Sequence, residues 1–414
     1  MKKKAGVMFV GARGHLSTTI MLGALAMRKG LCPPTGMVTA LDAFSNLNLT
    51  PPENLVFGGW DIRSSVAPGI IHQILAEVGF IARYDLDFIE KEMDKIAAGI
   101  FPGTTLNSGE AILKLADGKN PSKPETIKEI VGRLQRDIEL FREKHDLEDM
   151  VVVNLSSTEP LLENQQDVIT LARLEQIIRE NDAGAIRAGT LYAYAAINAG
   201  CVYINFTPSA SALVPGLIEL SEKRNLPIMG NDGKTGETLV KSVLAPLFAY
   251  RNLSVLSWQG YNMLGNMDGQ VLSNASNKSC KVKSKDQVLS KILGYKPHSQ
   301  VAIDYVPSLG DRKTAWDFIH FEGFLNTKMS LQFTWQGCDS ALAAPLVLDL
   351  VRLGLFAKRK SESGLMKHLA SFFKSPEGVS EYNMHDQFRM LMNYAYSHSP
   401  DCGRPEPIPT RKAT

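Results

Sequence analysis

The stretch AGVMFVGARGHLSTTIMLGALAMRKG, residues 5–30, decides the fold of this chain. It begins with a continuous apolar run that ends at a glycine, which is typical of a strand buried on both faces of a parallel sheet. The residues from His15 onward follow a helical spacing and end at Gly30. Strand, glycine turn and helix in this order predict the opening unit of a dinucleotide-binding domain, in which the helix N-terminus receives a pyrophosphate.

The turn itself matches the dinucleotide fingerprint only in part. Gly11 and Gly14 follow the strand, but Arg13 and Leu16 occupy the second and third glycine positions of G-x-G-x-x-G. Taken alone, the motif fits a merely tight strand-to-helix turn as well as a phosphate cradle. The sequence also does not identify the acidic residue that would bind a ribose. Asp42 and Asp61 are both candidates, and neither lies at the usual distance of about 20 residues after the glycine motif.

Further strand and helix patterns extend this unit into a doubly wound α/β domain. The segments DMVVVNLSST (149–158) and GCVYINFTPS (200–209) predict buried strands that end in small polar residues. Ligands bind at the carboxyl ends of such strands. PETIKEIVGRLQRDIELFREKH (124–145) predicts an amphipathic helix that leads into the first of these strands.

After about residue 240 the pattern becomes β-rich. LSVLSWQGYNML (253–264), QVAIDYVPSL (300–309) and KMSLQFTWQG (328–337) predict strands of a separate sheet, and SALAAPLVLDLVRLGLFAKR (340–359) returns to an apolar helix. We therefore expect a discontinuous Rossmann-like domain, 1–240 and 339–414, with an inserted β-rich domain at 241–338.

Composition narrows the class of protein. The chain has 414 residues, 44% of them hydrophobic, with 45 basic against 43 acidic side chains. Near-cancelling charge gives no electrostatic case for nucleic acid. The sequence shows no run of about 18 apolar residues of the kind that spans a membrane. Five scattered cysteines lack the spacing of a zinc site and fit reduced thiols in a cytoplasm.

Three polar segments in the second half are candidate loops. GNDGKTGET (230–238) places Gly233 and Gly236 around Lys234 without the order of a triphosphate-binding loop, and LGNMDG (264–269) also fits a simple turn. SNKSCKVKSKD (276–286) holds four lysines that fit either a solvated face or an anion site.

The order of these segments closely resembles the myo-inositol-1-phosphate synthase family. The resemblance extends from VGARG through FGGWDI, the GNDGKTGET loop, LGNMDG, the lysine cluster, GDRK and CDSALAAPLVLDL to SFFKSP. It implies an NAD-binding Rossmann domain, an inserted domain for catalysis and homotetramer assembly, and a sugar-phosphate substrate.

The resemblance also implies site residues. Those for catalysis are Lys281, Lys285, Lys313, Lys374 and Asp232. Those near the cofactor are Gly11, Gly14, His15, Asp61, Ser156, Ser157, Thr158, Asn266, Asp268, Asp311 and Asp339. Lys278 and Lys283 are expected to be solvated charge, and no histidine cluster indicates a metal site.

The implied reaction converts glucose 6-phosphate to inositol phosphate without net redox change. Oxidation at C5 permits deprotonation at C6, C6 attacks the C1 aldehyde, and the hydride returns to C5. Lys281 is the leading candidate for proton transfer at the C5 oxygen, and Lys313 and Lys374 are candidate oxyanion or phosphate ligands. A cyclase for fructose 6-phosphate and an NAD-binding scaffold without turnover are the two alternatives.

Overall fold

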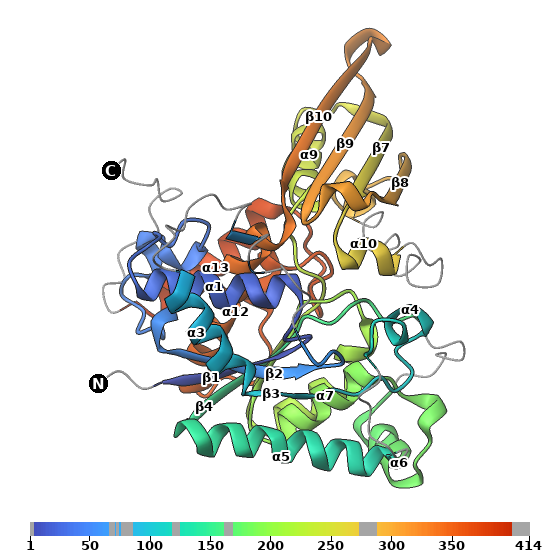
Figure 1. Ribbon diagram of the computed structural model, residues 1–414. Coiled ribbons are helices and arrows are strands. Elements are labelled where there is room, and N and C mark those ends of the chain that lie inside the picture. Colours follow the sequence, from blue (N-terminus) through green and yellow to red (C-terminus); the bar gives the residue numbers. More distant parts are fainter. Residues whose placement is uncertain are drawn as a thin grey trace.

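The computed structural model describes residues 4–65, 71, 74–75, 86–117, 125–160, 169–272 and 288–399. Two sheets organise this part of the chain (Figure 1). The larger has seven strands in the order β11-β6-β5-β4-β1-β2-β3, and every neighbouring pair is parallel. Its strands are β1 (Ala5–Val10), β2 (Leu55–Asp61), β3 (Ile100–Pro102), β4 (Asp149–Asn154), β5 (Val202–Asn205), β6 (Pro227–Gly230) and β11 (Gly364–Leu365).

Helices cover both faces of this sheet. One face packs against α1 (His15–Arg28), α3 (Leu86–Ala97), α12 (Asp339–Arg359) and α13 (Met384–Ser397). The other face packs against α5 (Ile127–His145), α6 (Leu171–Glu180), α7 (Ala188–Asn198) and α8 (Pro215–Lys223). Successive residues of β4 alternate between the two cores, with Val151 and Val153 in the first and Met150 and Val152 in the second. Burial on both faces explains why these strands are apolar throughout.

The smaller sheet has the strand order β10-β9-β7-β8. Its strands are β7 (Ser254–Leu264), β8 (His298–Tyr305), β9 (Arg312–Glu322) and β10 (Lys328–Cys338). β7 and β8 are parallel, and the other two pairs are antiparallel. Helix α9 (Glu237–Tyr250) packs on one face through Ala245 and Phe248. Figure 1 shows this sheet at the top of the molecule, with the β9–β10 hairpin extending furthest.

Two short helices and several single turns complete the description. The short helices are α4 (Glu110–Leu113) and α10 (Met267–Leu272). The 3₁₀ turns are η1 (Val38–Ala40), η2 (Asp42–Phe44), η3 (Pro52–Asn54), η5 (Ala183–Ala185), η6 (Ala210–Leu213), η7 (Pro307–Leu309), η8 (Phe324–Asn326) and η9 (Lys367–Phe372).

The chain leaves the first sheet and returns to it. β10 leads directly into α12, which packs in the same core as α1, and β11 then adds to the edge of the first sheet beside β6. The predicted discontinuous α/β fold with a separate β-rich part is therefore confirmed. Residues 240 and 241 both lie within α9, and the domain bounds 1–240, 241–338 and 339–414 stay predictions.

Strands predicted at 149–158, 200–209, 253–264, 300–309 and 328–337 are confirmed as β4, β5, β7, β8 and β10. β2 was not predicted as a strand, because two glycines interrupt its apolar run. A side chain at Gly59 would come within 2.1 Å of the Phe9 carbonyl oxygen, so close packing against β1 requires glycine there.

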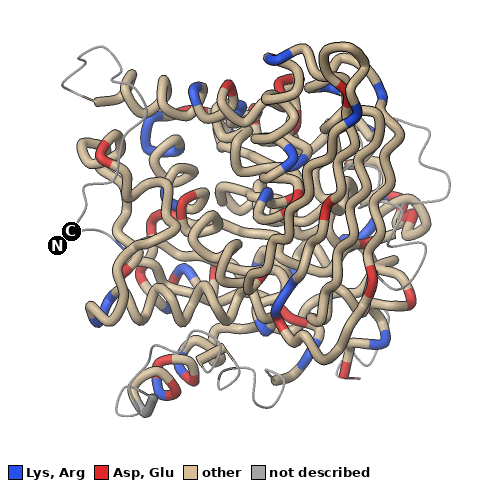
Figure 2. The backbone as a smooth tube through the Cα atoms, turned by 90° about the horizontal axis from the view of Figure 1, so that it is seen from above, with Lys and Arg blue, Asp and Glu red and all other residues tan. Residues whose placement is uncertain are grey.

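Helix α12 has a composition that membrane helices share. It is long and apolar enough to cross a bilayer, with a mean hydropathy of 1.7 over 18 residues, but 72% of that window is buried inside the protein. We therefore describe α12 as the central core helix. Figure 2 shows Lys and Arg interspersed with Asp and Glu over the described chain, as the near-neutral composition predicts.

Candidate active site

A cavity of about 250 Å³ lies at the carboxyl ends of the parallel strands. Its walls come from the loops after β1, β2, β4, β5 and β6, together with the first turn of α12 and Lys374. Asn266 and Lys313 reach it from the second sheet. The cavity therefore joins the two parts of the chain at the place where α/β sheets bind ligands.

The glycine turn forms one end of the cavity. Gly11 adopts φ 86°, a left-handed conformation that favours glycine. Gly14 is the N-cap of α1 and has no side chain that could hydrogen-bond the first-turn amides. Both ring nitrogens of His15 are buried and have no hydrogen-bond partner among the described residues. The first-turn amides of α1 and the His15 ring fit a pyrophosphate, which binds helix N-termini through backbone amides.

Asp61 is the last residue of β2 and lies beside the glycine turn. Its carboxylate accepts a hydrogen bond from the Arg13 backbone amide at 2.7 Å and another from the Arg63 amide at 2.9 Å. The Arg63 guanidinium adds an ion pair of 3.1 Å. Asp42, the other candidate acid, lies in η2 and does not line the cavity.

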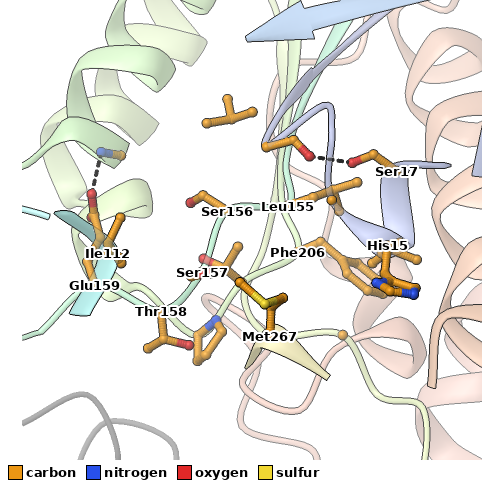
Figure 3. A pocket seen from close by; sticks show the side chains of 18 of the residues that line it. His15, Ser17, Ile112, Leu155, Ser156, Ser157, Thr158, Glu159, Phe206 and Met267 are labelled. Carbon is orange, nitrogen blue, oxygen red and sulfur yellow. Dashed lines mark hydrogen bonds between the residues drawn. The ribbon is translucent and has the colours of Figure 1, made fainter. Parts of the chain in front are cut away.

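The loop after β4 forms a second wall (Figure 3). Ser156 hydrogen-bonds the Asn154 side chain through its amide and its hydroxyl, at 3.1 and 2.7 Å. Glu159 is 4% exposed and accepts hydrogen bonds from the Gly189 amide at 2.9 Å and the Ser211 hydroxyl at 2.7 Å. Burial raises the pKa of Glu159. This carboxyl group ties the Ser156–Thr158 loop to α7 and η6.

Lys374 and Asp232 make a buried pair. The Lys374 ammonium donates to Asp232 Oδ1 at 2.8 Å, and the two side chains are 8% and 5% exposed. Their backbones are also joined, since the Lys374 amide donates to the Asp232 carbonyl at 2.6 Å. Asp232 Oδ2 is buried and has no hydrogen-bond partner among the described residues. That oxygen is a free acceptor in the wall of the cavity.

Gly233, next to Asp232 in the chain, lies in a closely packed position. Gly233 forms an antiparallel bridge with Phe373, and a side chain at Gly233 would come within 2.1 Å of the Phe206 ring. Glycine at this position therefore lets the 232–234 segment pack closely on the Phe206 ring.

Lys313 and Asp339 make a second pair on the side of the smaller sheet. Lys313 Nζ lies 3.5 Å from Asp339 Oδ1, and Lys313 is 8% exposed. Asp311 lies behind this pair and is 1% exposed. It accepts hydrogen bonds from the Ser340 amide and hydroxyl, both at 3.0 Å, and from Asn266 Nδ2 at 3.3 Å.

The comparisons with known proteins agree on one family. The family model described as myo-inositol-1-phosphate synthase matches residues 5–395. Inositol-3-phosphate synthase 1 of Bacteroides thetaiotaomicron is 33% identical over 413 residues, covering 94% of this chain and 94% of that protein. The chain belongs to the myo-inositol-1-phosphate synthase family.

Solved structures of this family share the fold. The inositol-3-phosphate synthase of Caenorhabditis elegans superimposes with a TM-score of 0.81 at 26% identity, covering 95% of this chain and 85% of that one. A myo-inositol-1-phosphate synthase-related protein from Thermotoga maritima has a TM-score of 0.76 at 24% identity, covering 95% of this chain and 98% of that one.

Most of the site residues that the family resemblance implied come together in the one cavity. Those that line it are Gly11, Gly14, His15, Asp61, Ser156, Ser157, Thr158, Asp232, Asn266, Lys313, Asp339 and Lys374. Asp311 does not line it and instead holds Asn266 and Ser340. Asp268 lies in α10, with its side chain outside the described part of the structure, and Lys278, Lys281, Lys283 and Lys285 lie outside the described residues.

The cavity residues that the sequence analysis missed include Arg63, Glu159 and Tyr192. For Arg63 and Glu159, the neighbouring sequence could have indicated a role in the site. Arg63 follows a candidate ribose-binding acid by two residues, and Glu159 follows directly on the Ser-Ser-Thr run. Tyr192 had no such signal in its neighbouring sequence, because its buried hydroxyl accepts a hydrogen bond from the Thr104 amide of a distant loop, at 2.7 Å. Among the described residues, no group of three or more His, Cys, Asp or Glu is placed to hold a metal ion.

Proposed function

We propose that this chain converts glucose 6-phosphate to a myo-inositol phosphate, with NAD as its cofactor. Membership of the family supports the reaction. The observation that carries the proposal is the meeting of two lysine–aspartate pairs, whose lysines are both buried, with an open glycine turn in one cavity. A simple dehydrogenase needs the glycine turn to bind its cofactor. The additional lysines near that turn suit a reaction in which negative charge develops on more than one oxygen.

The residues present fit a dinucleotide. Gly11 and Gly14 leave room for a pyrophosphate, and the N-terminus of α1, with no acidic residue in its first turn, favours an anion. His15, Ser156, Ser157 and Thr158 would hold the rest of the molecule along the cavity wall. Bound there, NAD would supply a reversible acceptor for the hydride at C5 of the sugar.

The lysines supply positive charge to the substrate. Lys374, from the loop after η9, and Lys313, on β9, are both buried and bring two ammonium groups to the cavity. In such a dry site an ammonium group stabilises a phosphate dianion or a developing oxyanion much more strongly than it does in water. We assign them to the phosphate and to the enolate and alkoxide oxygens that form during ring closure.

Two aspartates orient these ammonium groups. Asp232 holds Lys374 through Oδ1, and its unpartnered Oδ2 suits a sugar hydroxyl that donates a hydrogen bond. Asp339 holds Lys313 in the same way. Proton transfer at the C5 oxygen stays assigned to Lys281, with Lys285 beside it in sequence.

Isotope labelling tests the proposal. Glucose 6-phosphate with deuterium at C5 should give a cyclic product that keeps the deuterium at the same carbon, with no NADH accumulating in proportion to substrate. A simple dehydrogenase would release NADH and an open-chain keto sugar. Replacing Lys374 by Met should reduce turnover at least about 100-fold without unfolding the protein, since the charge is lost and most of the apolar stem is kept.

The matched control is Lys358→Met, on the far end of α12. Loss of the C5 label to solvent, or stoichiometric NADH, would contradict the proposed reaction. Turnover with fructose 6-phosphate but not with glucose 6-phosphate would support the alternative cyclase.

We further propose that the protein assembles as a homotetramer in the cytoplasm. The open face of the smaller sheet supports the first part, because it carries a row of aromatic rings that α9 leaves uncovered. Among the described cysteines, Cys32 and Cys201 are free thiols, which fits a reducing compartment.

A further inference from the structure

Asp61 has no acceptor capacity left for a ribose. Its Oδ1 accepts from the Arg63 amide at 2.9 Å and from Arg63 Nε at 3.1 Å. Its Oδ2 accepts from the Arg13 amide at 2.7 Å and from Arg63 Nη2 at 3.3 Å. A carboxylate offers about four lone-pair positions, so the chain itself fills all of them. In dinucleotide-binding domains, an acid at the end of this strand usually accepts hydrogen bonds from the ribose hydroxyls. Here Arg13 and Arg63 donate to the oxygens that would accept them.

The same contacts leave guanidinium donors at the site. Arg13 Nη1 donates to the Arg63 carbonyl at 2.8 Å, which holds the Arg13 side chain against the residue that follows the β2 strand end. A guanidinium has five N–H donors. The hydrogen bonds above use one of them on Arg13 and two on Arg63. The two arginines therefore present cationic donors where a typical NAD site presents a single negative charge.

A hollow lies beside these arginines. It has a volume of about 210 Å³ and is lined by Arg13, Arg63, Ser64, Pro102, Gly103 and Asp117 among others. The main cavity and this hollow share Asp61, Ile62 and Arg63 as lining residues, so the hollow continues the cavity past the end of β2. Asp117 is the one further acid that lines it among the described residues, and its carboxylate accepts a hydrogen bond from the Ser64 amide.

We propose that this end of the dinucleotide site accepts a 2′-phosphate, so that the chain binds NADP(H) as well as NAD(H). The inference rests on the proposed function, because it requires a dinucleotide in the main cavity. Its physical basis is that Asp61 is neutralised by Arg63, which removes the repulsion that normally excludes the phosphate. Arg63 and Arg13 can then donate to its oxygens, the contact for which guanidinium geometry is suited.

Direct binding to cofactor-free protein tests the proposal. Titration calorimetry with NADH and with NADPH should give dissociation constants within about tenfold of each other. NADPH binding should weaken more steeply with added salt, because an extra phosphate is neutralised. Arg63→Ala should weaken NADPH at least about tenfold, as expected for lost charge-assisted hydrogen bonds, and NADH less than about threefold.

Two further variants keep the result interpretable. Arg63→Lys retains the positive charge but loses the planar guanidinium that donates two parallel hydrogen bonds. Its affinity for NADPH should lie between those of wild type and Arg63→Ala. Arg389→Ala, at an exposed site on α13, should leave both affinities unchanged. Thermal melts of each variant identify loss of folding.

The possible outcomes are distinguishable. NADPH binding about 100-fold weaker than NADH in the wild type would overturn the inference and leave the proposed function intact. Equal weakening of both nucleotides in Arg63→Ala would also overturn it, since Arg63 would then only support Asp61. Absence of binding by either nucleotide would contradict both the inference and the proposed function.

Discussion

At the scale of single residues, Lys234 is in an unusual environment. It is 3% exposed, and its ammonium group donates to Gln387 Oε1 on α13. Burial, and secondarily the nearby charge of Lys374, lower the pKa of Lys234 to about 7. The residue does not line the cavity, but its backbone amide donates to Phe372 and so shares the bridge that holds Asp232 and Lys374.

This lysine should make stability depend on pH. Its pKa rises from about 7 in the folded chain to the ordinary value of 10.5 on unfolding. Between these values the unfolded chain binds a proton that the folded chain lacks, so the free energy of unfolding should rise with pH, by up to about 1.4 kcal/mol per pH unit. Below about pH 7 both states are protonated and this contribution should be flat.

Urea unfolding of Lys234→Met measures the effect. The variant should lack this part of the slope between about pH 7 and pH 9.5. The exposed Lys114→Met is the matched control and should keep the wild-type slope. Identical slopes in wild type and Lys234→Met would show that the buried lysine stays charged.

At the scale of elements, the start of α12 depends on a residue from outside the helix. Cys338, the N-cap, makes no side-chain capping bond. Asp311, in the turn before β9, replaces it by accepting from the Ser340 amide and hydroxyl. The Asp311 carbonyl also accepts from the Asp339 amide at 3.1 Å. One side chain therefore positions α12, which carries Asp339 into the cavity.

Removing this cap should cost stability and activity together. Asp311→Ala leaves the buried donors of Ser340 and Asn266 without their acceptor, and we expect a loss of about 1–3 kcal/mol in the free energy of unfolding. Lys313 should lose its oriented partner, so turnover should fall as well. Denaturant titration and steady-state assays check both parts. The exposed Asp304→Ala should stay within about 0.5 kcal/mol of wild type, and an equally small change in Asp311→Ala would contradict the capping role.

At the scale of the whole molecule, the smaller sheet has one covered and one open face. Ala315, Asp317 and Ile319 on β9 are buried towards α9, whereas Trp316 is 37% exposed on the opposite face. The rings of Tyr261, Trp316, Phe318 and His320 form a stacked row there, with centroids 5.6, 6.5 and 6.4 Å apart. Aromatic rows of this kind are enriched at interfaces between subunits.

A charge in this row should separate the subunits. Trp316→Lys introduces an ammonium group that would be desolvated in an interface, so the mass measured by light scattering should fall below that of the tetramer proposed for the wild type. Leu140→Lys, at a position 56% exposed on α5, is the control and should leave the mass unchanged. A wild-type monomer, or a Trp316→Lys protein of unchanged mass, would contradict assembly through this face.

The sequence by itself determined the features that short-range patterns encode. The apolar runs of β1, β4 and β5 identify strands buried on both faces. In a strand covered by helices on each side, every side chain points into a core, so nearly all positions are apolar. The order of motifs from VGARG to SFFKSP was enough to predict the family, which the comparisons confirm.

Only the tertiary structure decided which groups are paired and how they are solvated. Asp232 and Lys374 are 142 residues apart in the chain and meet beside the bridge between Gly233 and Phe373. Asp61 has the sequence position of a ribose ligand, yet Arg13 and Arg63 fill its acceptor sites. The pairing and the solvation of a charged group are properties of contacts between distant segments, and no local pattern of residue types records them.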